Sequence, residues 1–152
     1  MLEVSHEEFT GASPEVVWKI WSNPKSWKFW DSGLEWCKLK AGHRFEVGGE
    51  ALLLPKMAPQ PLSIIIVECT PNKSFTDKAR FDLGEIYVSH EVRPKGNGSI
   101  IKHKLQYYEA NLEAKTIFEN KMWKHLQKEL PASVKTLAQF ATKADSLIFQ
   151  NV

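Results

Sequence analysis

The chain has 152 residues, of which 43% are hydrophobic and 25% charged, a composition typical of one globular domain over residues 1–152 rather than a disordered, collagen-like or repeat protein. Its 20 basic and 18 acidic residues nearly cancel, so the basic excess of a dedicated nucleic-acid binder is absent and we expect no nucleic-acid partner. The six Trp, eight Phe and three Tyr are a large aromatic content, which must fill a core or line a cavity.

The chain begins with a predicted strand and two predicted short helices. Residues 2–9 alternate weakly between apolar and polar side chains, which indicates a strand. Ser13 is a good N-cap and Pro14 suits the first helical position, so a helix is expected to start there. A second short helical segment is predicted over residues 24–30 (PKSWKFW).

From residue 34 to 108 the pattern changes to the two-residue period of strands. Gly, Pro and Asn turn signals separate short apolar-alternating segments, as in consecutive hairpins. We therefore expect an antiparallel meander of about seven strands. Its segments are LEWCKL, HRFEV, EALLL, LSIIIVEC, SFTDKARF, EIYVSHEV and SIIKHKLQYY.

The remainder, from about residue 112, has helical periodicity. Apolar side chains recur every four residues along this segment, which predicts a long amphipathic helix that is helical over 113–143. Pro131 is expected to kink the helix or to split it in two. The residues in the repeat are Phe118, Met122, Leu126 and Leu130.

No feature of the sequence indicates secretion or membrane insertion. The start MLEVSHEEF carries three glutamates where a signal peptide needs a basic region and an apolar run, and no stretch approaches 18 apolar residues. We therefore expect a cytoplasmic protein with no integral membrane association. Cys37 and Cys69 form no CxxC pair, which argues against a disulfide scaffold or a cysteine-rich zinc site.

The order of a strand, two short helices, six strands and a long C-terminal helix accompanies the segment ASPEVVWKIWSNPKSWKFWDSGLEWCKLKAGHRFEV. This sequence resembles the START/Bet v 1-like (SRPBCC) superfamily, especially its polyketide cyclase/dehydrase and lipid-transport branch, over about residues 2–144. The resemblance is carried by Ser13, Pro14, Val17, Trp18, Trp30, Leu39, Gly42 and the segment IVECTPNKSF.

The resemblance implies an α+β helix-grip fold, in which a curved antiparallel sheet of about seven strands wraps around the long C-terminal helix, with two short helices after the first strand. An apolar cavity is then expected between sheet and helix. Members of the superfamily bind lipids, sterols, polyketides or aromatic compounds; some cyclise polyketides, and a related branch activates the Hsp90 ATPase. These motifs are structural, so they support the fold more than any one activity.

Strand parity places three polar residues on otherwise apolar faces. Because side chains alternate along a strand, Asp77, His90 and His103 each point to the same side as their apolar neighbours. A two-residue turn at Leu83-Gly84 would put Asp77 opposite His90, and a loop over residues 95–98 would put His90 opposite His103. We therefore predict a row of these three residues on the concave face. A turn at Asn97-Gly98 would leave the histidines diagonal, and a bulge would break the row.

Such a row has three alternative roles. Asp77 could fix the tautomer of His90, leaving an imidazole to move a proton in enolate chemistry, so Asp77, His90 and His103 are the catalytic candidates. The same groups could hydrogen-bond a ligand, or simply be satisfied within the wall. Two histidines and a carboxylate also suit some zinc and iron sites, but no HxH or HExxH spacing accompanies them, and we expect no metal.

The sequence therefore favours binding of a small hydrophobic molecule, with no bound cofactor, and indicates no oligomeric state. The alternatives are a cyclase/dehydrase-type enzyme and an Hsp90-activator-like interaction module. Binding predicts an open apolar cavity, an enzyme predicts convergent titratable groups, and an interaction module predicts a filled core with an exposed apolar patch. The expected ligand-binding residues are Trp30, Phe45, Leu52, Ile66, Asp77, Val88, His90, His103, Leu105, Met122 and Leu126.

Overall fold

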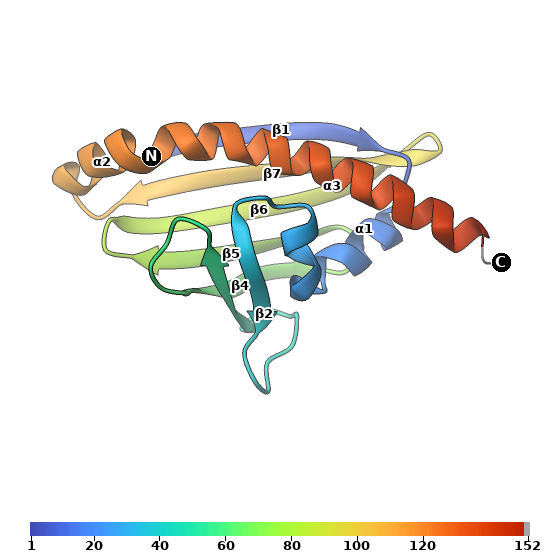
Figure 1. Ribbon diagram of the computed structural model, residues 1–152, viewed down its shortest axis with the longest axis horizontal. Coiled ribbons are helices and arrows are strands. Elements are labelled where there is room, and N and C mark those ends of the chain that lie inside the picture. Colours follow the sequence, from blue (N-terminus) through green and yellow to red (C-terminus); the bar gives the residue numbers. More distant parts are fainter. Residues whose placement is uncertain (151–152) are drawn as a thin grey trace.

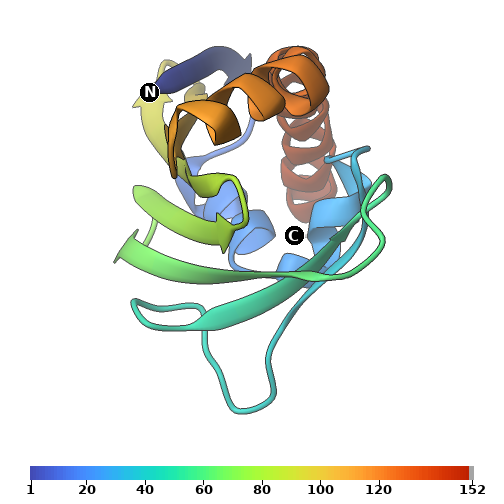
Figure 2. The same cartoon turned by 90° about the vertical axis from the view of Figure 1, so that its left-hand side faces the viewer.

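The computed structural model describes residues 1–150, so the last two residues of the domain predicted over 1–152 lie outside it. Seven strands form one antiparallel sheet in the order β1-β7-β6-β5-β4-β3-β2. The sheet curls into a half-barrel whose concave side faces the helices (Figures 1 and 2). The predicted α+β helix-grip class is confirmed. The strands are β1 (Leu2–Thr10), β2 (Leu34–Leu39), β3 (Glu50–Pro55), β4 (Leu62–Thr70), β5 (Ser74–Phe81), β6 (Gly84–Lys95) and β7 (Gly98–Glu109).

Five helical segments complete the described part of the chain. The α-helix α1 (Pro14–Trp21) and the 3₁₀ helix η1 (Pro24–Phe29) carry the chain from β1, at one edge of the sheet, to β2 at the other. The C-terminal part consists of α2 (Leu112–Phe118), the π-helical segment η2 (Glu119–Trp123) and α3 (Lys124–Gln150). Helix α3 runs along β1 and β7 (Figure 1), so the core lies between this helix, the two short helices and the concave face of the sheet. Within residues 1–150, no helix is both long and apolar enough to span a membrane.

The start of α1 follows from local chemistry. The Ser13 side chain accepts a hydrogen bond from the backbone N–H of Val16 at 3.3 Å, and Pro14 occupies the first turn, where its missing N–H costs nothing. The helix buries one apolar stripe against the sheet, including Trp21, which is fully buried. This helix is as predicted.

The strand predicted at HRFEV (43–47) is wrong, because residues 40–49 form a loop. Gly42 and Gly48 adopt positive φ angles of 80° and 88°, which turn the backbone out of the extended conformation. Phe45 nevertheless points inward, with its ring centroid 4.9 Å from that of Phe75. The half-buried Phe45 ring and two backbone hydrogen bonds to β4 therefore hold the loop against the core. The Gly48 N–H donates to the carbonyl of Ile66, and the Ile66 N–H donates to the carbonyl of Gly49.

The C-terminal helix departs from the expected pattern at one place. Pro131 lies inside α3 and does not split it, whereas the π-helical segment η2 interrupts the helix 8 residues earlier. Figure 2 shows the axis of α2 turning into that of α3 at this segment. A π-helical turn inserts an extra residue, so the side chain that follows buried Phe118 on the inner face is half-buried Trp123, and Met122 is exposed. The prediction that Met122 lines the interior is therefore wrong.

This phase shift makes a testable prediction about two neighbouring residues. Trp123→Ala should lower the free energy of unfolding in urea by about 2 kcal/mol, because the indole packs against the core. Met122→Ala should change it by less than about 0.5 kcal/mol, because that side chain is exposed. The reverse order of the two effects would contradict the π-helical insertion.

Candidate functional site

Two histidines lie side by side on the concave face of the sheet. His90 of β6 pairs with His103 of β7 in the predicted register, and their ring centroids are 4.5 Å apart with the ring planes at 73°. Each residue is only 3% exposed. The short turn that fixes this register is Gly96-Asn97, between the paired residues Lys95 and Gly98. The predicted inward parity of both histidines is confirmed.

Aromatic rings surround the histidine pair. The ring of His90 stacks on that of Phe75 with centroids 3.8 Å apart and planes within 6°. The rings of Trp21 and Trp30 lie 5.8 and 5.7 Å from that of His103. These tryptophans come from α1 and from the end of η1, so it is the short helices that cover the histidines. The result is a water-excluding aromatic enclosure around two imidazoles.

Burial keeps both imidazoles neutral. Loss of solvation lowers the pKa of His90 to about 3, although its Nδ1–H donates to the carbonyl oxygen of Phe75 at 3.2 Å. The pKa of His103 is also well below its ordinary value, first because of burial and second because of the neighbouring His90. Near pH 7 the pair therefore consists of neutral rings that can donate or accept a hydrogen bond.

Three buried nitrogens in this enclosure have no hydrogen-bond partner among the described residues. They are Nε2 of His103 and the indole Nε1 atoms of Trp21 and Trp30. An indole N–H can only donate, so two of the three groups need an acceptor. Leaving such groups unpaired costs roughly 1–3 kcal/mol each, which makes the enclosure a place where an acceptor atom would be stabilised.

Asp77 lies on the same concave face but outside the predicted row. It pairs with Val88, and His90 pairs with Phe75 instead. The turn between β5 and β6 is Asp82-Leu83, one residue earlier than predicted, because Gly84 belongs to the sheet and pairs with Phe81. Gly84 has a φ of 139°, and a Cβ there would collide with the backbone of the neighbouring strand β7, so no other residue fits this position.

The predicted cross-strand row is therefore wrong for Asp77, whereas its His90–His103 part is confirmed. The carbonyl of Phe75, not the carboxylate of Asp77, fixes the tautomer of His90. Among the described residues Asp77 makes no hydrogen bond through its side chain, and burial raises its pKa to about 7. Asp77 is thus an isolated acid on an apolar face. Within residues 1–150, no three His, Cys, Asp or Glu side chains are close enough together to hold a metal ion.

The other predicted lining residues divide into two groups. Ile66 and Leu105 are buried on the concave face. Val88 is half-buried on the same face, and Leu126 of α3 is half-buried where it packs against the core. Leu52 lies on the opposite face of β3. Its neighbour Ala51 is buried, and side chains alternate along a strand, so Leu52 points outward. Its cross-strand partners are Lys38 and Ser63. The inward prediction for Leu52 is wrong.

Two residues that complete the aromatic enclosure were not among the predicted site residues. Trp21 belongs to the apolar stripe of α1, and Phe75 shares the inward parity of Asp77, so both carry a sequence signal for burial. Their proximity to the histidines could not be inferred, because it depends on how α1 crosses the sheet.

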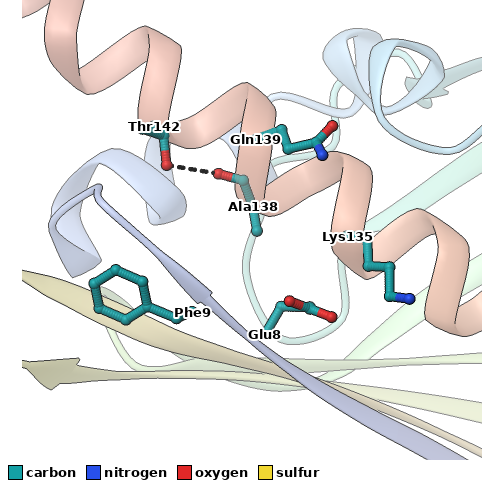
Figure 3. A pocket seen from close by; sticks show the side chains of 6 residues that line it. All are labelled: Glu8, Phe9, Lys135, Ala138, Gln139 and Thr142. Atoms are coloured by element: carbon teal, nitrogen blue, oxygen red, sulfur yellow. Dashed lines mark hydrogen bonds between the residues drawn. The ribbon is translucent and has the colours of Figure 1, made fainter.

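Two hollows open on the outside of the described part of the protein. One, of about 230 Å³, lies where β1 meets α3 and is lined by Glu8, Phe9, Lys135, Ala138, Gln139 and Thr142 (Figure 3). Thr142 donates to the carbonyl of Ala138 there, and the hydroxyl of Thr10 at the end of β1 donates to the same carbonyl, which ties β1 to the helix. The other hollow, of about 310 Å³, lies between η1 and β2.

Comparison with solved structures shows the same fold throughout. Protein TTHA0849 from Thermus thermophilus is 15% identical with a TM-score of 0.74, covering 94% of this chain and 99% of its own. A point mutant of norcoclaurine synthase from Thalictrum flavum, in complex with a transition-state analogue, is 17% identical with a TM-score of 0.67, covering 94% and 95%. Ara h 8.0201 is 10% identical with a TM-score of 0.63, covering 93% and 98%.

The family assignment comes from the sequence itself. No curated protein matches the chain. Residues 11–135 match the family model of Activator of Hsp90 ATPase homolog 1-like protein, which corresponds to the branch named above as an alternative. This match spans α1, the whole of the sheet except β1, and the first half of the C-terminal helix. The chain therefore belongs to the Activator of Hsp90 ATPase homolog 1-like family of the START/Bet v 1-like superfamily.

Proposed function

We propose that the protein binds a small hydrophobic molecule on the concave face of the sheet, between β6 and α3. The observation that carries this proposal is the incomplete burial of apolar side chains that face inward. Ile86 and Val88 of β6 and Leu126 of α3 pack against the core but stay half-buried, whereas Leu105 beside Val88 is buried. Covering apolar surface of this kind with a ligand removes it from water, which lowers the free energy.

The polar groups nearby define the chemistry that a ligand would need. The unpaired indole N–H groups of Trp21 and Trp30 require an acceptor, and Asp77, with a pKa near 7, exists partly as a neutral acid that donates. A largely apolar molecule with a carbonyl or hydroxyl oxygen satisfies both requirements. Charged ligands are disfavoured, because the enclosure contains no described ion pair that could stabilise them.

A substitution that fills this space tests the proposal. Val88→Trp should weaken binding of an uncharged fluorescent sterol probe by at least about tenfold, because the indole would occupy the ligand's volume. Val67→Trp is the matched control, since Val67 is exposed on β4 and binding should not change. Near-ultraviolet circular dichroism establishes that both variants remain folded. Equal binding by the two variants, or none by the wild type to fatty acids, sterols and aromatic compounds, would refute the proposal.

A second candidate function is docking on an Hsp90-type chaperone, and the family match to an activator of the Hsp90 ATPase favours it. The dense aromatic packing around the histidines also fits a protein with a filled core. The test measures the ATPase rate of an Hsp90-type chaperone with increasing amounts of the protein. If the Val88→Trp variant stimulates the ATPase as strongly as the wild type does, docking uses the outer surface and needs no interior ligand.

A further inference from the structure

The cleft between η1 and β2 is an open hollow whose volume lies at the lower limit for small-molecule sites. Its volume is about 310 Å³, and the residues that line it are Lys25, Lys28, Trp36, Cys37 and Lys38. Sites for small ligands begin at roughly this volume. Three of the five lining residues are lysines and one is tryptophan, a combination that neither the fold nor the proposed interior ligand requires.

The three lysines line one cleft because of the elements that carry them. A 3₁₀ helix has about three residues per turn, so Lys25 and Lys28 of η1 lie one above the other on the same side. Lys38 comes from the adjacent strand β2, and its Nζ lies 5.2 Å from the centroid of the Trp36 ring. Among the described residues, none of these lysines is in an ion pair, so their positive charges are uncompensated.

Trp36 adds a flat apolar surface to this positive cleft. The indole is half-buried, and it is a cation–π partner of Lys38. Stacking on an indole favours a planar ring, and three ammonium groups favour an anion. Inorganic phosphate would leave the indole unused, and a neutral aromatic compound would leave the lysines uncompensated.

We infer that this cleft binds a planar aromatic anion, with its ring on Trp36 and its anionic group between Lys25, Lys28 and Lys38. The site is separate from the concave face. Trp36 and Lys38 pair with Leu54 and Leu52, which face away from the core, whereas Cys37 between them is buried on the other side of the strand. An interior ligand and an anion in the cleft therefore do not compete for space.

The experiment is an NMR titration of the full chain with 1-naphthyl phosphate, observed at the indole N–H signals. Trp36→Phe identifies the signal of Trp36, which is expected to move on titration while those of Trp21 and Trp30 stay in place. Lys28→Gln and Lys38→Gln should each weaken binding by about threefold, as expected for exposed charge pairs. Trp36→Leu should weaken it by about tenfold, the scale of stacking on one aromatic ring. Added salt should weaken binding by the wild type.

Lys135→Gln is the matched control, because it removes the same charge from the separate hollow between β1 and α3. The inference fails if the Lys28→Gln/Lys38→Gln double variant binds the probe as tightly as the wild type does. It also fails if Lys135→Gln weakens binding as much as Lys28→Gln or Lys38→Gln does. It fails equally if inorganic phosphate binds as tightly as the naphthyl ester, or if millimolar probe leaves the Trp36 signal unmoved. Binding of an acidic peptide without binding of the probe would also overturn it, and would assign the cleft to a protein partner.

Discussion

Replacing Asp77 by Asn is expected to raise the free energy of unfolding at about pH 8 by on the order of 3 kcal/mol. Burial raises the pKa of Asp77 to about 7 from an ordinary value of 3.8, and Asp77 makes no described hydrogen bond that would offset the lost solvation. Above pH 7 the folded protein must hold a buried carboxylate, which is better solvated in the unfolded chain. An uncharged amide of the same shape removes that cost.

The effect of Asp77→Asn should depend on pH in a defined direction. Between about pH 4 and pH 7 the folded state holds a proton on Asp77 that the unfolded state has lost, so this group's contribution to stability falls as pH rises. The gain from the substitution should therefore be largest at about pH 8 and close to zero near pH 4. Urea unfolding across this range measures it. Asp82→Asn, at the exposed β5–β6 turn, is the control and should show no such trend. A gain independent of pH would contradict the explanation.

Acidification is expected to remove the stability that the two histidines contribute, because both must stay neutral in the folded state. Burial lowers the pKa of His90 to about 3, and that of His103 well below its ordinary value. The unfolded chain takes up protons on both side chains as pH falls through about 6.5, and the folded chain does not. The stability that the pair contributes is thus fully present above pH 6.5 and is lost progressively below it.

Asp77 and Asp31 oppose this loss, which gives a quantitative test. Between about pH 6 and pH 5, unfolding takes up about two protons on His90 and His103 and releases about one from Asp77 and most of one from Asp31, whose pKa burial raises to about 6. Each proton corresponds to about 1.4 kcal/mol per pH unit, so these exchanges nearly cancel and the stability of the wild type should change little over this range. Asp77→Asn should lose about 1.4 kcal/mol per unit on acidification, and adding His103→Phe should remove most of that loss. A flat profile for Asp77→Asn would show that the imidazoles are protonated within the fold.

Short-range chemistry made several features predictable. The start of α1 depends on Ser13 and Pro14, which act within one helical turn. The inward parity of His90 and His103 follows from strand alternation, because a slip of one residue would turn the apolar residues of β6 and β7 to solvent. The glycine and asparagine between these strands favour a tight turn, so the pairing of the two histidines was also accessible from sequence.

The errors arise where a choice depends on distant parts of the chain. Leu83-Gly84 looks like a turn locally, but Gly84 is needed inside the sheet, where β7 approaches too closely for a side chain. The period of four through Met122 is a regular helical pattern, yet the π-helical insertion at η2 moves Trp123 to the inner face. Neither departure has a local signal strong enough to outweigh the pattern around it.

The sequence by itself determined the order of most elements and the face on which most strand residues lie, because these depend on periodicity and on turn and capping chemistry within a few residues. It also indicated the superfamily, through its resemblance to known members. Only the tertiary structure decided which residues meet across that face: Phe75 rather than Asp77 beside His90, Trp21 and Trp30 over His103, and three lysines around Trp36. Such contacts depend on strand register and on the path of α1 and η1 across the sheet. Packing of the whole core sets both, and no single segment encodes them.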